Sequence, residues 1–253
     1  MAVDEAILQA IGRGDVLPTL RLYAWDPPCL SLGYAQSFSD VDHEQLNGHG
    51  WDVVRRITGG RAILHTDELT YSVIGHHDEP RFAGSVIESY QRLSQGLLEA
   101  LHLLELPAEA LPKSSEGAVT QEPVCFEAPS HFEITVNDKK LIGSAQARKK
   151  AGVLQHGTLP LFGDLTRITD VLVFPSDEDR INAGKRLLKR ATTIETAMGP
   201  GITWEQAAAA VCKAFSTTFT LKLEPAELTS TELAQAEEFV EEKYAHPSWT
   251  ERI

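Results

Sequence analysis

Residues 51–75 read WDVVRRITGGRAILHTDELTYSVIG and contain three strand-like runs in succession. Its three runs WDVVRRI, RAILHT and LTYSVIG are rich in β-branched and aromatic residues and are bounded by turn residues, which is typical of strands. Thr58-Gly59-Gly60 separates the first two runs, and glycines at such a point favour a turn. The N-terminal part of the chain is therefore predicted to form a β-sheet.

Further predicted strands flank this stretch on both sides. LRLYAW and CLSLGY precede it and are separated by Asp26-Pro27-Pro28. After it, FEITVN and LIGSAQARKK are expected to pair as a hairpin, because Asn137-Asp138 between them supplies residues that favour a tight turn. VLQHGTLPLF is expected to add one more strand. A mixed β-sheet is thus expected at the centre of the fold.

Helices are expected around this sheet. In residues 86–104 the apolar side chains recur every three or four positions, which gives a helix one apolar face. Between residues 107 and 129 no periodicity survives, and prolines punctuate a long connection; long ordered loops of this kind tend to carry function. Other helices are predicted over residues 2–11, 40–46, 164–171, 180–189, 204–215 and 230–244.

The pattern indicates one α/β (α+β) domain with flanking helices. The chain has 253 residues and shows no repeat, low-complexity tract or linker, and domains of mixed type often reach this size. We therefore expect residues 1–253 to form a single domain, with the helical part 164–253 packed on the sheet.

Composition excludes several classes of protein. There are 23 basic and 36 acidic side chains, so the formal charge is 23 − 36 = −13, which argues against a general nucleic-acid binder. Hydrophobic residues make up 42% and charged residues 23%, as in an ordinary globular protein. The start has no signal-peptide pattern, and no apolar run approaches the roughly 18 residues that span a bilayer. A cytoplasmic location and no membrane partner are expected.

The three cysteines form no CxxC pair, so neither a disulfide framework nor a zinc ribbon is expected. Cys29 opens a predicted strand and Cys212 lies in a helical run, where core packing explains both. Cys125 lies in the irregular segment PVCFEAPS. Free cysteine is usually a small buried hydrophobe, and the alternative for Cys125 is a nucleophile.

A nucleophilic thiol needs a nearby positive charge, because its ordinary pKa of about 8.5 leaves little thiolate at neutral pH. The predicted hairpin is a basic island in an acidic chain, since it carries Lys139, Lys140, Arg148, Lys149 and Lys150. One of these could lower the thiol pKa while others dock an acidic partner. The alternative is a solvated strand edge protected by lysines, which fits Lys149 and Lys150 better than Lys140.

The run RRITGGRAILH joins a strand, two glycines and three arginines, a composition suited to close backbone approach to an anionic ligand. It matches neither the P-loop nor the dinucleotide pattern, and a plain hairpin turn explains it as well. His65 and His156 are candidate bases or structural histidines. His76-His77 could suggest a metal, but further ligands at suitable spacing are lacking, so no metal site is expected.

Three stretches, RRITGGRAILHTDELTYSV, PVCFEAPSHFEITVNDKKLIGSAQARKK and LQHGTLPL, resemble the lipoate–protein ligase and octanoyltransferase family, which shares its fold with biotin protein ligases. The resemblance runs from Met1 to about Phe162, and a weaker one covers the terminal KYAHPSWTER. It is strongest to the cysteine-dependent octanoyltransferases of LipM type, because these also have a CFxAPS segment, TGGR and an ELTYS run.

The resemblance implies a biotin/lipoyl protein ligase-like catalytic domain that transfers an octanoyl group. Cys125 would be the acyl-thioester nucleophile, and Lys140 would match the family's essential lysine, which lowers the pKa of that thiol and orients the acyl carbonyl. The candidate substrate-binding residues are Arg56, Gly59, Gly60, Arg61, His65, Gly143, Ser144, Ala145, His156, Gly157 and Thr158.

The resemblance also implies the partners. Octanoyl-acyl carrier protein would be the donor, and the acceptor lysine would belong to a lipoyl domain of a 2-oxoacid dehydrogenase E2 subunit or to the glycine cleavage H protein. No cofactor is expected, because the acyl-phosphopantetheine of the carrier is already activated as a thioester.

Three alternatives remain open. An ATP-dependent lipoate–protein ligase would share the fold and Lys140, but such enzymes typically have a third glycine where this chain has Arg61, and Cys125 would be superfluous to them. An amidotransferase would move octanoyl from one lipoyl domain to another. A module without catalytic activity would only bind acyl carrier protein or lipoyl domains.

Overall fold

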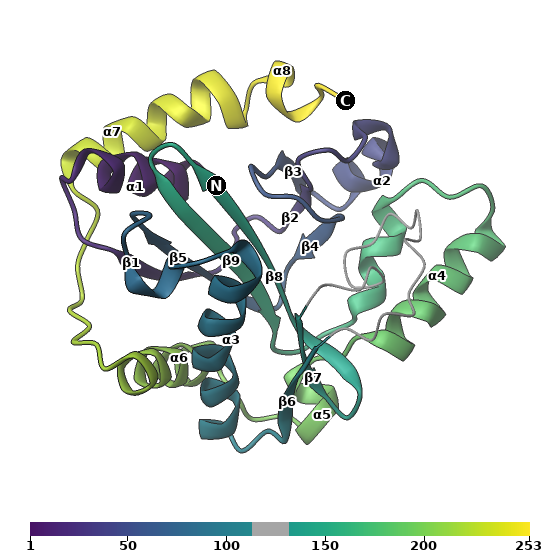
Figure 1. Cartoon of the computed structure of the whole chain (residues 1–253). Helices are drawn as coiled ribbons and strands as arrows, with labels where there is room; N and C mark the ends of the chain where they lie inside the picture. The colour runs from purple at the N-terminus through teal and green to yellow at the C-terminus, as the bar shows by residue number, and fades with distance from the viewer. Residues whose placement is uncertain (113–131) are drawn as a thin grey trace.

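The computed structural model describes residues 1–112 and 132–253, and Figure 1 shows their strands flanked by helices. The larger sheet is antiparallel and has the order β1-β5-β9-β8-β7-β6. Its strands are β1 (Thr19–Tyr23), β5 (Glu68–Gly75), β6 (Ala108–Pro112), β7 (Phe132–Val136), β8 (Lys139–Lys149) and β9 (Gly152–Pro160). The mixed α/β fold class expected from the sequence is confirmed.

The hairpin predicted around Asn137-Asp138 is present. β7 pairs with β8, and both turn residues have positive φ, 51° for Asn137 and 60° for Asp138, a backbone that asparagine and aspartate tolerate well. The pairing has a β-bulge: Ile134 is opposite Ile142 and Thr135 is opposite Lys140, so Leu141 is the extra residue. A bulge redirects side chains locally, and this one lies next to Lys140.

The smaller sheet corrects one expectation. Its strands are β2 (Cys29–Leu32), β3 (Asp52–Arg55) and β4 (Ile63–His65), in the order β3-β2-β4. β2 is parallel to β3 and antiparallel to β4. The run TGGR is therefore not the turn of a simple hairpin, since β2 lies between the two strands that it connects. The loop crosses over β2 instead, and a Cβ atom on Gly33 would lie 1.8 Å from the Gly60 carbonyl oxygen.

The two faces of the larger sheet differ in chemistry at β5. Leu69 and Tyr71 belong to a core with the helices α3 (Val86–Leu103) and α6 (Trp204–Phe219). The alternate residues Thr70 and Ser72 are buried on the opposite face, because successive side chains of a strand point to opposite sides. The polar face of β5 is thus turned toward the smaller sheet and α1 (Ala2–Arg13).

The short helices Ile194–Met198 and Pro247–Thr250 were not predicted, but the other α-helices begin and end close to the predicted positions. α3 starts after Ser85, which forms a capping box with Glu88, an arrangement that satisfies free N–H groups of the first turn. The other helices are α2 (His43–Gly48), α4 (Asp177–Arg190), α5 (Ile194–Met198), α7 (Ser230–Phe239) and α8 (Pro247–Thr250). Short 3₁₀ segments cover Phe38–Asp40 and Pro80–Phe82, and a π turn covers Val240–Tyr244.

Residues Leu165–Val171 form a 3₁₀ helix, in agreement with the helical segment predicted over residues 164–171. One other expectation was wrong. Ala108–Pro112 forms the edge strand β6 inside the stretch that was expected to lack regular structure. Alanine and glutamate are poor strand formers, so β6 owes its conformation to pairing with β7.

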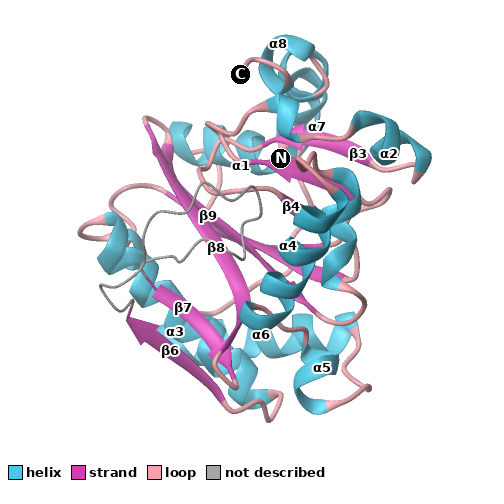
Figure 2. Cartoon of the chain, turned by 90° about the vertical axis from the view of Figure 1, so that its right-hand side faces the viewer, coloured by secondary structure: helices cyan, strands magenta, loops and turns pink. Residues whose placement is uncertain are grey.

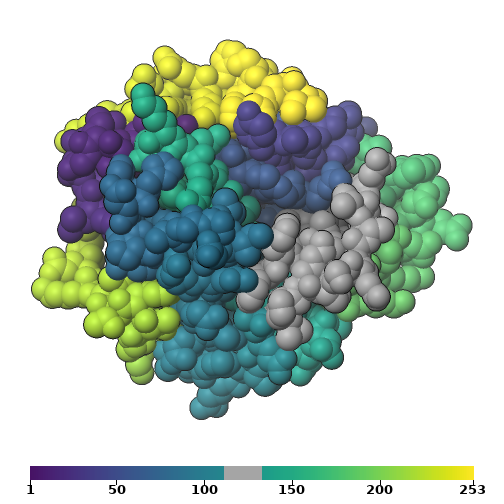
Figure 3. Space-filling model, in the orientation of Figure 1, coloured from purple at the N-terminus to yellow at the C-terminus, as the bar shows by residue number. Residues whose placement is uncertain are grey.

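The C-terminal segment packs on the N-terminal half, as Figure 3 also shows. The buried guanidinium of Arg55 donates hydrogen bonds to the carbonyls of Thr250 (2.8 Å) and Gly33 (2.9 Å), and the indole of Trp249 donates to the Arg55 carbonyl (2.9 Å). The assignment of the whole chain to one domain stays a prediction. No helix of residues 1–112 and 132–253 has both the length and the apolar character needed to cross a bilayer.

Candidate active site

A cavity of about 140 Å³ lies between the polar face of the larger sheet and the smaller sheet. β8 contributes Lys140 and β9 contributes His156, while β4 contributes His65. Apart from Cys125 and Gly59, the structure brings all the candidate residues together in its wall: Arg56, Gly60, Arg61, His65, Lys140, Gly143, Ser144, Ala145, His156, Gly157 and Thr158. Met1, Ile63 and Thr70 complete the lining.

Two candidate residues do not share this wall. Cys125 lies outside the described residues. Gly59 lines a neighbouring pocket of about 320 Å³, which Gly60 also borders. The loop that carries both glycines therefore separates the two hollows.

The two described cysteines are poor nucleophiles. Cys29 is buried in β2, and burial raises the pKa of its thiol to about 12. Cys212 lies on α6, and desolvation raises its pKa as well. A thiol with a raised pKa carries almost no thiolate at neutral pH. The core position expected for Cys29 is confirmed, whereas the one expected for Cys212 was wrong, because Cys212 lies on an exposed face of its helix.

Lys140 of β8 contributes a cationic side chain to the cavity wall. Its side chain is only 5% exposed, and its Nζ lies 3.2 Å from Glu133 Oε1 of β7. The backbone of Lys140 is fixed from the other side by a bridge to Ala191, and its carbonyl accepts a hydrogen bond from Thr192 N at 3.0 Å. A buried ammonium is retained only when other groups compensate for its charge, so this site is built around a cation.

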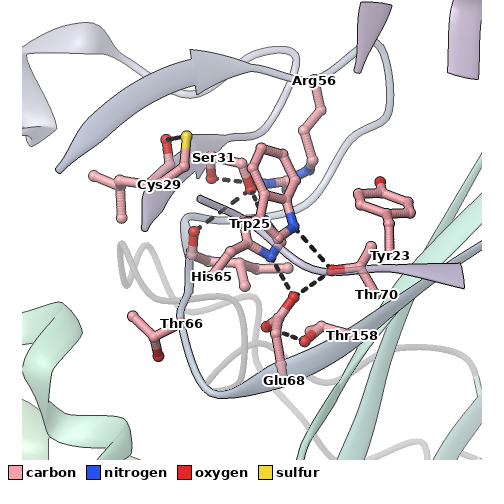
Figure 4. A network of polar contacts seen from close by, with 12 residues as sticks. Tyr23, Trp25, Cys29, Ser31, Arg56, His65, Thr66, Glu68, Thr70 and Thr158 are labelled. Carbon is pink, nitrogen blue, oxygen red and sulfur yellow. Dashed lines mark hydrogen bonds and ion pairs between the residues drawn. The ribbon is translucent and has the colours of Figure 1, made fainter. Parts of the chain in front are cut away.

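A buried polar network forms the opposite wall (Figure 4). Arg56 donates to Ser31 Oγ at 2.7 Å, Ser31 Oγ contacts His65 Nε2 at 2.6 Å, and His65 Nδ1 contacts Glu68 Oε1 at 2.7 Å. The Glu68 carboxylate also accepts hydrogen bonds from the hydroxyls of Thr70 and Thr158. Both ring nitrogens of His65 are therefore engaged, so His65 holds the wall and does not present a lone pair to the cavity.

The same network fixes the glycine loop. The second guanidinium nitrogen of Arg56 donates to the carbonyls of Gly59 (3.2 Å) and Arg61 (2.9 Å). Gly60 between them has a φ of 99°, a backbone conformation that favours glycine. Gly60 and the two hydrogen bonds from Arg56 together hold the loop in one conformation. Arg56 thus acts on the cavity by positioning its wall.

His156 is buried in the cavity wall, and its Nε2 lies 2.7 Å from Thr58 Oγ1. Burial is the main cause that lowers the pKa of His156 to about 3. The imidazole is therefore neutral at physiological pH and is suited to hydrogen bonding in the wall, whereas a general base needs a pKa near the working pH.

This pKa predicts a pH dependence of stability. The folded-state pKa of His156 lies below the unfolded value of 6.5, so the unfolded chain takes up a proton first as pH falls. We expect the contribution of His156 to the free energy of unfolding to be fully present above pH 6.5. Between pH 6.5 and pH 3 this contribution should fall by at most about 1.4 kcal/mol per pH unit. His156→Gln should remove that part of the slope in urea titrations; an unchanged slope would contradict the assignment.

Glu68, Ser31 and Thr58 also belong to the site, although the sequence analysis does not single them out. Glu68 is the acidic residue that opens the ELTYS run. The available signal was an acidic side chain that opens an otherwise uncharged strand, which needs buried partners such as Thr70, Thr158 and His65. In residues 1–112 and 132–253 no three His, Cys, Asp or Glu side chains gather as a metal-binding group.

Comparison with known proteins identifies the family. The family model described as the lipoyl protein ligase A/B catalytic domain matches residues 1–216. The chain belongs to this family. Within the lipoyl protein ligase A/B family it is 41% identical to octanoyltransferase LipM of Kyrpidia tusciae, with 100% of this chain and 93% of that protein covered. It is 37% identical to octanoyltransferase LipM of Staphylococcus aureus, with 98% and 92% covered.

Solved structures of the family have the same fold. A bipartite lipoate protein ligase from Thermoplasma acidophilum, studied with its E2 lipoyl domain, superposes with a TM-score of 0.81 at 25% identity, covering 99% of this chain and 89% of that one. A lipoate-protein ligase A bound with ATP gives a TM-score of 0.78 at 24% identity, with 99% and 92% covered. Given the LipM relatives, this member of the lipoyl protein ligase A/B family is an acyltransferase with octanoyltransferase function in lipoate biosynthesis.

Proposed function

We propose that the chain takes octanoyl from acyl carrier protein onto Cys125 and passes it to the lysine of a lipoyl domain. In the first step the Cys125 thiolate attacks the donor carbonyl, a new C–S bond forms, and the bond to the phosphopantetheine sulfur breaks. In the second step the neutral amine of the acceptor lysine attacks the enzyme thioester and forms an amide. The Cys125 thiolate leaves, and the amine loses its proton to solvent.

The observation that carries this proposal is the buried ammonium of Lys140 in the wall of a cavity that the TGGR loop, β8 and β9 also line. A cation near the reacting carbonyl stabilises the oxyanion that develops on it, and in a water-poor site such a contribution reaches a few kcal/mol. The same charge lowers the pKa of a neighbouring thiol. Both effects are those that the resemblance implies for Lys140.

The cavity also suits a saturated acyl chain. Ile63, Ala145 and the glycines of β8 and β9 give it an apolar part, and each CH₂ buried there contributes about 0.8 kcal/mol. The free energy for amide formation comes from the donor thioester, so the proposed reaction uses neither ATP nor a metal nor another cofactor. The acceptor is proposed to be a lipoyl domain of an E2 subunit or the glycine cleavage H protein.

Reconstitution tests the proposal. Octanoyl-acyl carrier protein, the enzyme and an unmodified lipoyl domain, mixed without ATP, should give one octanoyl group on the lipoyl domain by intact-protein mass spectrometry. Free octanoate should give no product with or without ATP. Modification that requires ATP and free acid would indicate a ligase, and transfer from an octanoylated lipoyl domain alone would indicate the amidotransferase.

A further inference from the structure

One face of α4 is exposed and combines aliphatic with basic side chains. Ile181, Lys185, Leu188 and Lys189 follow the spacing i, i+4, i+7, i+8, which places them on one side of a helix. Ile181 is 53% and Leu188 45% exposed, and both lysines are exposed. We call these four residues the α4 face. Figure 2 shows α4 at the surface on the side turned toward the viewer.

The charge of this region is opposite to that of the chain. The first turn of α4 is acidic, with Asp177, Glu178 and Asp179, whereas four of its last six residues are Lys185, Arg186, Lys189 and Arg190. The net charge of the whole chain is −13. Basic residues near a helix C-terminus also complement the helix dipole, but the dipole does not account for the exposed aliphatic side chains of Ile181 and Leu188.

The basic end of α4 adjoins the catalytic cation. Lys139 Nζ donates to the Leu188 carbonyl at 2.7 Å, and Ala191, the first residue after α4, bridges to Lys140. Lys185 and Lys189 precede Ala191 by six and two residues, so at 1.5 Å per residue they lie about 9 and 3 Å farther along the helix axis. The C-terminal end of the α4 face therefore lies beside the part of β8 that carries Lys140.

We infer that the α4 face docks the carrier of the acyl donor, an acidic protein whose acyl group hangs on a phosphopantetheine arm. This inference rests on the proposed function. An acidic, partly apolar surface complements lysines interleaved with Ile181 and Leu188, and charge complementarity of this kind guides encounter and orientation.

Reach favours the donor over the acceptor. The phosphopantetheine arm has twelve bonds between its phosphate-ester oxygen and its sulfur. Four residues of extended polypeptide have the same number of backbone bonds and span about 14 Å, so the arm has about this reach. A lysine side chain has five bonds from Cα to Nζ and spans about 6 Å by the same measure. The α4 face lies on the order of 10 Å from Lys140 along the helix, so an acyl arm crosses this gap whereas an acceptor lysine must dock at the cavity mouth itself.

The lysines at the other end of the hairpin provide a matched comparison. Lys149 and Lys150 are exposed basic residues and were expected as a docking point from the sequence. Lys149 lines the neighbouring pocket with Gly59 and Gly60, but it lies nine residues from Lys140 on β8. At 3.3 Å per residue this is about 30 Å, so an arm docked there does not reach the Lys140 ammonium.

The test compares Lys185→Glu/Lys189→Glu with Lys149→Glu/Lys150→Glu, which make the same charge change. For the first pair we expect the KM for octanoyl-acyl carrier protein to rise about tenfold at low salt, while kcat stays nearly unchanged. In high salt the difference in KM from the wild type should shrink, because salt screens the charges. The second pair should change KM by less than about twofold. Octanoyl-pantetheine, which lacks the carrier, should acylate the enzyme equally in all variants. Leu188→Ser, which keeps every charge, should raise the same KM about threefold.

Each contrary outcome overturns the inference. An unchanged KM for octanoyl-acyl carrier protein in the first pair would show that the α4 face does not bind the carrier. Equal increases in KM in both pairs would show that the net charge of the enzyme, and not the α4 face, causes the effect. A raised KM for the lipoyl domain alone would assign the face to the acceptor. A wild-type enzyme that takes no octanoyl from the carrier would overturn the proposed function together with this inference, whereas the other outcomes leave the proposed function intact.

Discussion

Cys125→Ser is expected to lower the rate of octanoyl transfer at least about 10³-fold, because an alkoxide at neutral pH is far scarcer than a thiolate and the covalent route is lost. Steady-state transfer from octanoyl-acyl carrier protein to a lipoyl domain measures this. Cys29→Ser and Cys212→Ser are matched controls, since desolvation raises the pKa of both thiols and both lie outside the cavity wall. They should retain activity within about threefold.

This pattern separates a nucleophile from a structural thiol. Equal losses in all three serine variants would point to a general effect on folding, which thermal unfolding of each variant detects. Full transfer by Cys125→Ser would show that the reaction does not pass through a thioester on Cys125. ATP-dependent ligation by that variant would favour the ligase alternative.

Lys140→Met is expected to lower kcat/KM for octanoyl transfer by about 10²- to 10³-fold. Methionine keeps most of the volume and removes the charge from a side chain that is 5% exposed. The substitution should also slow alkylation of Cys125 by iodoacetamide at neutral pH and move the pH profile of that reaction upward, because the thiol loses its cationic neighbour. A merely structural lysine would not move this profile.

The adjacent lysine supplies the control for Lys140. Lys139→Met removes the same charge one residue away, where Nζ bonds the Leu188 carbonyl, and should leave kcat within about threefold. If Lys140→Met retained wild-type kcat/KM and alkylation profile, the proposed role of Lys140 would be wrong.

Most elements could be predicted from the sequence because their signals are local. The apolar period of α3, the alternation in β7 and the turn residues Asn137-Asp138 each depend on neighbours within a few positions. The pairing of β3 and β4 with β2, and not with each other, could not be predicted, since the pattern of a strand does not reveal which strand lies beside it. β6 could not either, because only its partner β7 makes Ala108–Pro112 extended.

The same distinction holds at the site. The glycine loop, Lys140 and the HGT run of β9 carry dense motifs, and they line one cavity. The buried contacts of Glu68 with His65, Thr70 and Thr158 join β4, β5 and β9. Such contacts depend on tertiary packing, and no spacing in the sequence encodes which hydroxyl reaches a carboxylate.

The octanoyl group is proposed to rest covalently on the sulfur of Cys125, and intact-protein mass spectrometry after incubation with octanoyl-acyl carrier protein detects this adduct. We predict an enzyme carrying one octanoyl group that neutral hydroxylamine releases, that maps to Cys125 after proteolysis and that disappears when a lipoyl domain is added. An enzyme that transfers octanoyl while Cys125 stays unmodified throughout would contradict the account.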